Sequence, residues 1–259
     1  MQKQELTGKR QEAWTISRYQ QWVKCPLQYA LEHHPHLVID RFKGWTIKRL
    51  PEREKGPALQ RGIDVHEMFD VFLQTGVPPE EMHPHFPIFD RWGDLLFALR
   101  DTIESADAGG NEVMWSYDEE WYPVERGAAV WHRQKLDAWV VNDDTAVVTD
   151  FKTGKYYDTN LEQMEVYTVG TFARFDDVQT VYTGLWYVDM AINDDEDNGM
   201  LNPLTAVYTR EEDASRLANR WEKRARQFLE DTEYRAKPNF LCRYCAFNAK
   251  KGGPCTKGI

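Results

Sequence analysis

An apolar run that ends in alternating charges strongly limits what the middle of this chain can form. Residues 146–152 read AVVTDFK. Branched apolar residues in such a run are typical of a buried β-strand. Charged side chains are almost never buried unless they are paired or bind a metal. A strand that ends in Asp150 and Lys152 therefore needs either a local partner for each charge or a bound cation.

The preceding strand supplies a second carboxylate. Residues 128–141 also have a strand pattern, and 142–144 reads as a turn. A two-residue Asp143-Asp144 loop, or a four-residue loop in the same register, would place Asp137 directly across from Asp150, with Cβ atoms about 4.5–5.5 Å apart. Lys152 points to the same face as Asp150 because side chains alternate along a strand.

These three side chains predict a divalent-cation site. Two facing carboxylates repel each other unless a positive charge lies between them, and oxygen ligands completed by water and phosphate suit Mg²⁺ or Mn²⁺. The alternative is an ordinary solvated ladder of Asp150 and Lys152, with Asp137 as a charged edge residue. A register slip of one residue would turn Asp137 to the opposite face.

The rest of the pattern predicts a mixed α/β layer fold. We expect helices at 17–32 (kinked at Pro26), 57–74, 88–107, 160–175 and 211–230. We expect further strands at 112–123, 178–190 and 204–210. One side of the second helix carries Leu59, Ile63, His66 and Leu73. The 259 residues fit one domain with an appended subdomain, because strands followed by helices around one sheet form a single core.

Charge and hydropathy limit the partners. The chain has neither an N-terminal apolar segment nor an apolar run near 18 residues, so we expect no membrane contact and a cytoplasmic location. The net charge of −10 argues against nucleic acid. However, the helix at 211–230 is rich in arginine, and one basic face can coexist with a negative total. That face is either a DNA track or a solvated surface with pairs such as Glu222 and Arg226.

All four cysteines belong to a one-plus-three arrangement, with Cys25 near the start and Cys242, Cys245 and Cys255 near the end. Disulfides are not expected in a cytoplasmic chain, so the C-x₂-C pair and its two companions predict a metal centre. Four thiolates suit either Zn²⁺ or a [4Fe–4S] cluster, and spacing does not separate the two. The alternative is four unrelated buried thiols.

Four segments together resemble a known family. RGIDVHEMF, KLDAWV, VTDFKTGK and QMEVY occur in this order. They resemble the PD-(D/E)XK nucleases, in the branch that includes the RecB and AddB nuclease domains and the Cas4 proteins. The resemblance extends over about residues 15–255. It implies a restriction-endonuclease-like α/β core, with a central mixed sheet flanked by helices. Gln134 stands where the family often has glycine.

The resemblance also implies roles for individual residues. The divalent metal would be bound by His66, Asp137, Asp150 and the carbonyl group of Phe151. Lys152 would position or activate the attacking water, and Gln163 and Tyr167 would contact DNA or the catalytic groups. A [4Fe–4S] cluster would be held by Cys25, Cys242, Cys245 and Cys255. The segment 250–253 makes the last cysteine spacing longer than is usual in the family.

The expected function is that of a metal-dependent DNA nuclease, and specifically a single-strand-preferring exonuclease of recombination, repair or phage DNA processing in a bacterial, archaeal or phage-infected cell. Its substrate would be single-stranded DNA or DNA with free ends. Since no P-loop occurs, unwinding would come from a separate helicase or recombination protein. The alternatives are a Cas4-type nuclease of CRISPR adaptation and a catalytically inactive DNA-binding Fe–S protein. We expect one nuclease domain, 1–259, in which 1–56 and 234–259 form a cluster-bearing subdomain around the core 57–233.

Overall fold

The computed structural model describes residues 13–52, 56–125, 129–190, 192 and 202–258. The helices are α1 (Ile16–Lys24), α2 (Pro26–His33), α3 (Pro57–Thr75), α4 (Phe86–Ser105), α5 (Thr159–Arg174) and α6 (Ser215–Leu229). The strands are β1 (Ala108–Tyr117), β2 (His132–Asn142), β3 (Thr145–Lys152), β4 (Thr180–Tyr187) and β5 (Leu204–Thr209).

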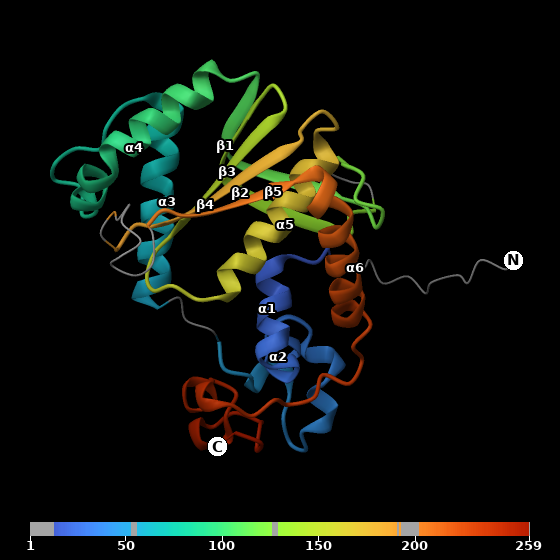
Figure 1. The fold of residues 1–259 in the computed structure, drawn as a ribbon. Coiled ribbons are helices and arrows are strands. Elements are labelled where there is room, and N and C mark those ends of the chain that lie inside the picture. Colours follow the sequence, from blue (N-terminus) through green and yellow to red (C-terminus); the bar gives the residue numbers. More distant parts are fainter. Residues whose placement is uncertain (1–12, 53–55, 126–128, 191, 193–201, 259) are drawn as a thin grey trace, which may run out of the picture.

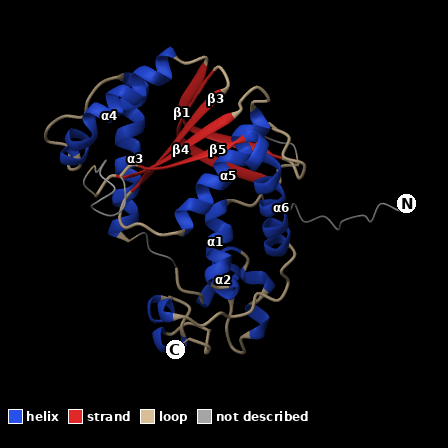
Figure 2. Ribbon diagram, viewed as in Figure 1, coloured by secondary structure: helices blue, strands red, loops and turns tan. Residues whose placement is uncertain are grey.

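These strands form one five-stranded sheet in the order β1-β2-β3-β4-β5. Figure 2 shows the sheet in red, with helices packed around it. The first three strands are an antiparallel meander, whereas β3 and β4 are parallel and are joined through α5. A parallel neighbour requires a crossover of this kind. Since β5 returns antiparallel to β4, the sheet is mixed, and the predicted fold class is confirmed to this extent.

The turn between β2 and β3 sets the register of the site. Asn142 pairs with Thr145, so the loop is the two-residue Asp143-Asp144 turn, the shorter of the two loops that the sequence allows, and Asp143 has a φ of 49°. Positive φ is what the favoured hairpin turns require. The same register, carried one pair beyond Ala138 and Thr149, puts Asp137 opposite Asp150.

The two faces of the sheet are covered by different helices (Figure 1). Helices α3 and α4 bury Phe69, Phe72 and Trp92 against one face. Helices α1, α5 and α6 bury Tyr19, Phe172 and Trp221 against the other. In the part of the chain that the structure describes, no helix combines the length and the apolar character needed to span a membrane.

The helices correct one sequence expectation and refine another. The helix expected at 17–32 is two helices, because Cys25 is extended with a φ of −163°. Proline disfavours the helical conformation of the residue before it, so Pro26 breaks the helix instead of kinking it. In α3, Leu59 and Ile63 are exposed, whereas Leu73, on the side of the helix that the sequence grouped with them, is buried.

The first strand also differs from its expected range of 112–123. It begins at Ala108, which pairs with Val141, and it ends at Tyr117. Two glycines at 109 and 110 weaken the strand pattern there, so only pairing with β2 reveals this part of the strand. The sequence also predicts a turn at Gly127, between the first two strands, and this residue lies outside the described residues.

A buried histidine couples the stability of this sheet to pH. His132 is fully buried, and its Nδ1 lies 3.2 Å from the carbonyl oxygen of Trp14. Burial lowers the pKa of His132 to about 3. In the unfolded chain His132 has a pKa near 6.5, so it binds a proton below that pH. In the native state it stays neutral over the same pH range, so protonation favours the unfolded chain. The stability contributed by neutral His132 is thus complete above about pH 6.5 and is lost as the pH falls toward 3.

We expect the free energy of unfolding to fall by about 2 kcal/mol between pH 6.5 and 5 because of this one residue. His132→Gln should remove that part of the slope in urea unfolding curves recorded at both pH values. His36→Gln, at an exposed position, serves as the matched control and should keep the wild-type slope. Equal slopes for wild type and His132→Gln would contradict this assignment.

Candidate functional site

Two buried carboxylates lie where β2 and β3 meet α3. Asp137 and Asp150 are only 6% and 4% exposed. Oδ2 of Asp137 accepts a hydrogen bond of 2.7 Å from the backbone N–H of Phe151, and Oδ1 lies 3.2 Å from Nδ1 of His66. The ring of Phe151 packs edge-on against Phe69 in the core. Asp137 therefore connects the sequence-predicted residues of α3, β2 and β3.

Asp150 is held from the other side by α5. Its Oδ1 accepts hydrogen bonds from Nε2 of Gln163 at 2.8 Å and from the hydroxyl group of Tyr167 at 3.0 Å. Nζ of Lys152 donates to Oε1 of Gln163 at 2.8 Å and lies 2.5 Å from Oδ2 of Asp150. Among the described residues, the Lys152 ammonium is the one partner of that Oδ2. One carboxylate oxygen thus keeps a lone pair for a ligand.

The electrostatics of the site indicate a shortage of positive charge. Burial raises the pKa of Asp150, and the charge of Asp137 raises it further, against the opposing effect of Lys152. Burial lowers the pKa of His66, but its hydrogen bond to Asp137 and the charges of the two carboxylates outweigh this and leave the pKa raised. Burial, with the same two carboxylates, also raises the pKa of Tyr167, which stays a neutral donor. A bound cation would relieve these interactions.

Close packing of α3 on the loop after β3 fixes the geometry of the site. A Cβ atom at Gly62 would lie 3.1 Å from Oγ1 of Thr153. Gly154 has a φ of 96°, and its N–H donates to Oδ2 of Asp189 at 2.7 Å. Both guanidinium nitrogens of Arg61 also contact the Asp189 carboxylate. The carboxylate of Asp189, after β4, therefore connects α3 with the loop that follows β3.

The chemistry of the donor set suits a divalent ion, because carboxylate oxygens and an imidazole nitrogen would be its ligands. Among the described residues, the group whose ligand atoms all lie within 4.8 Å of one another is His66, Glu112 and Asp137. His66 and Glu112 border an open groove of about 520 Å³.

Glu112 is the residue that sequence reasoning missed. It lies within β1, and only the pairing of β1 with β2 brings it near Asp137. The connection between these strands is too long for a turn rule to set the register. Its one sequence signal is an acidic residue within a strand of alternating pattern.

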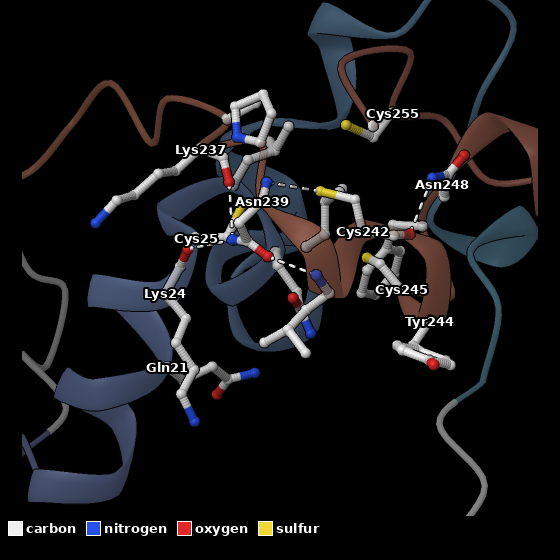
Figure 3. Close-up of a pocket in the computed structure, with 18 of the residues that line it drawn as sticks. Gln21, Lys24, Cys25, Lys237, Asn239, Cys242, Tyr244, Cys245, Asn248 and Cys255 are labelled. Atoms are coloured by element: carbon white, nitrogen blue, oxygen red, sulfur yellow. Dashed lines mark hydrogen bonds between the residues drawn. The ribbon is translucent and has the colours of Figure 1, made fainter. Parts of the chain in front are cut away.

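The four cysteines surround one cavity of about 660 Å³ (Figure 3). All four are free thiols and half-buried. Cys25 lies at the junction of α1 and α2, whereas the other three lie in the C-terminal segment. Burial raises the pKa of Cys245, and the three other cysteines raise it further. The structure thus brings together all the cysteines that the sequence singled out.

The long segment between Cys245 and Cys255 folds back on itself. Residues Ala249–Lys251 form a short 3₁₀ helix, after which the N–H of Cys255 donates to the carbonyl oxygen of Phe247 at 2.8 Å. A Cβ atom at Gly253 would lie 2.2 Å from the carbonyl carbon of Phe247, so only glycine permits this approach. The inserted segment therefore returns Cys255 to the cavity.

The arginines of the last long helix are paired with carboxylates. The pairs are Arg216–Asp213, Arg220–Glu165, Arg224–Glu162 and Arg226–Glu222. Two of these carboxylates belong to α5, so the arginines help to fix α6 against it. The i,i+4 pair of Glu222 and Arg226 is confirmed, and this pairing favours the solvated-surface interpretation over a DNA track.

The position of Gln134 resolves a departure from the family pattern. Its side chain is buried against Gly170 of α5, where a Cβ atom would lie 2.3 Å from the Gln134 amide nitrogen. The larger residue in β2 is thus accommodated by a glycine in the helix that packs on it.

Comparisons with known proteins place the chain by family. Residues 13–249 match the model of the PD-(D/E)XK nuclease superfamily. No curated protein matches the chain. Similar solved structures include a candidate exonuclease from Eubacterium rectale, with 14% identity over 96% of this chain and 93% of that chain and a TM-score of 0.48. Another is a phage-related exonuclease from Haemophilus somnus, with 10% identity over 70% of this chain and 89% of that chain and a TM-score of 0.28.

Proposed function

Because this chain belongs to the PD-(D/E)XK nuclease superfamily, we propose that it hydrolyses phosphodiester bonds of DNA with Mg²⁺ or Mn²⁺. The observation that carries the proposal is the pair of buried carboxylates, Asp137 and Asp150, beside the ammonium of Lys152. The ion would be held by His66, Asp137, Asp150 and the carbonyl group of Phe151. When bound, such an ion makes its water more acidic and offsets charge on the scissile phosphate.

The residues around the carboxylates have positioning and charge-stabilising roles. Lys152 is oriented between Asp150 and Gln163, so its ammonium is fixed before substrate arrives. Fixed positive charge next to a phosphate that gains negative charge lowers the barrier to hydrolysis. Gln163 accepts from the ammonium and donates to Asp150, and Tyr167 donates toward Asp150. These two residues of α5 hold the catalytic groups in register.

We propose an exonuclease with a preference for single strands, acting in the cytoplasm on DNA with free ends that a separate helicase or recombination protein unwinds. The groove beside His66 is lined by Leu59 and Ile63, which are 50% and 40% exposed. Unpaired bases expose apolar faces that such side chains can contact, whereas bases in a duplex are stacked. This exposed aliphatic pair supports the strand preference.

We propose further that the four cysteines hold a [4Fe–4S] cluster. The four free thiols line one cavity of about 660 Å³, which supports a shared centre. The alternative is a tetrahedral Zn²⁺ site with four thiolate ligands. Leu27, Val38 and Phe247 pack around the same segments. This packing supports a cluster-bearing subdomain of residues 1–56 and 234–259 beside the core 57–233.

Digestion of end-labelled DNA tests the proposed function. With Mg²⁺ or Mn²⁺ we expect linear single strands to be shortened from an end, duplexes to be cut more slowly, circular single strands to resist, and EDTA to stop all cleavage. Lys152→Met should abolish cleavage, whereas Lys155→Met, an exposed lysine after the same strand, should not. DNA binding without cleavage would support the inactive alternative, and cleavage of circles would contradict the exonuclease assignment.

A further inference from the structure

We propose that Glu112 is a further ligand of the divalent ion, and that Lys135 occupies the Glu112 carboxylate when the ion is absent. The inference rests on the proposed function, because it adds a residue to the metal site of His66 and Asp137.

The pairing of β1 with β2 puts Glu112 across from Asp137. Asn111 pairs with Ala138, and Val113 pairs with Leu136, so the same register applies on both sides of Glu112. Residues that face each other in this way share one side of the sheet. A ligand atom of Glu112 lies within 4.8 Å of those of His66 and Asp137. Three ligands from α3, β1 and β2 therefore converge on one point.

The backbone at Glu112 departs from the strand at this point. Its φ is 50°, and the ladder omits the Glu112–Asp137 pair although the register does not change. The left-handed conformation is unfavourable for a residue with a Cβ atom, and strand pairing alone would not select it. Such residues persist where the surrounding structure holds them, often at ligand sites. Here the departure occurs opposite the buried carboxylate of Asp137.

The present partner of Glu112 can be displaced. Nζ of Lys135 pairs with Oε2 of Glu112, and the two side chains are 54% and 20% exposed. A largely exposed lysine on a flexible stem can move into water at little cost, since exposed ion pairs are weak. The carboxylate, which is less exposed, would stay in place. An arriving divalent ion would then compete with the ammonium for the same oxygen atoms.

This competition predicts opposite effects of two substitutions. Glu112→Gln removes an anionic ligand and should weaken Mn²⁺ binding at least about tenfold. Lys135→Gln removes the competitor and should tighten binding several-fold. The double variant should bind as weakly as Glu112→Gln alone, because Lys135 acts through Glu112. Glu67→Gln is the matched control, since Glu67 is an exposed carboxylate that lines the same groove.

The experiment is a titration of the full-length protein with Mn²⁺ in the absence of DNA, in which electron paramagnetic resonance measures the free ion. Thermal unfolding checks that each variant is folded. Wild-type affinity in Glu112→Gln would overturn the inference and leave the proposed function intact. If Lys135→Gln tightened Mn²⁺ binding by the same factor in the wild type and in Glu112→Gln, the inference would also be overturned. That result would show only a general effect of charge. No binding by the wild type would overturn both proposals.

Discussion

Asp150→Asn is expected to slow DNA hydrolysis by about 10³-fold or more, as is typical when a preorganised charge is removed from a catalytic site. The substitution keeps the shape of the side chain and its ability to accept from Gln163 and Tyr167. It removes the anionic partner of Lys152 and one proposed ligand of the divalent ion. Initial rates on end-labelled single strands, measured at saturating Mn²⁺, give the effect.

The stability of the same variant separates a catalytic effect from misfolding. Burial raises the pKa of Asp150, so the native state holds its proton to higher pH than the unfolded chain does. The charge therefore reduces stability as the pH rises through the raised pKa. At pH 7 the metal-free Asp150→Asn protein should be at least as stable as the wild type.

Asp158→Asn changes an exposed carboxylate near the same loop and should leave the rate unchanged. An Asp150→Asn protein that cuts at the wild-type rate would refute the assignment of the hydrolytic site. A variant that loses both its rate and its fold would instead point to a structural role for Asp150.

The part of the site that could be predicted from sequence depends on local rules. The apolar run of β3 and the two acidic turn residues determine the register, and this places Asp137 opposite Asp150. Alternation along the strand then relates Lys152 to Asp150. One hairpin is enough for these relations, and no information about distant segments is required. The prediction of a metal site therefore depends on this hairpin.

Features that depend on distant pairing could not be predicted. Glu112 approaches Asp137 only through the β1–β2 register, which a long connection leaves open. Leu59 and Ile63 have the spacing of a core face, but they lie in the early turns of α3 and line the groove instead of the core. Periodicity gives the faces of a helix, whereas the element packed against it decides which face is buried at each turn.

The cysteines illustrate the same limit on a longer scale. Their number and their one-plus-three arrangement predict a shared centre, but sequence spacing does not relate Cys25 to residues more than two hundred positions away. The break before Pro26 and the fold-back at 250–253 are what bring Cys25 and Cys255 to one cavity. Both are backbone features, and only the fold-back required glycine at a position of close approach.

Cys25→Ala is expected to abolish the iron and acid-labile sulfide of the purified protein and to lower the free energy of unfolding by about 5 kcal/mol. The estimate treats the cluster as a cross-link that closes a loop of more than two hundred residues, which removes conformational entropy from the unfolded chain. Anaerobically purified wild-type protein should be brown and contain about four iron atoms per chain. Elemental analysis and denaturant unfolding measure the two effects.

Lys24→Ala is the matched control, because Lys24 lines the same cavity but offers no thiolate. It should retain iron and stability. The hydrogen bond of 3.4 Å from the N–H of Asn239 to Sγ of Cys242 indicates that this sulfur already serves as an acceptor, as a thiolate ligand does. About one zinc per chain without sulfide would show that the cluster assignment is wrong. The hydrolytic site would be unaffected by that result, because none of its ligands comes from the cysteine segments.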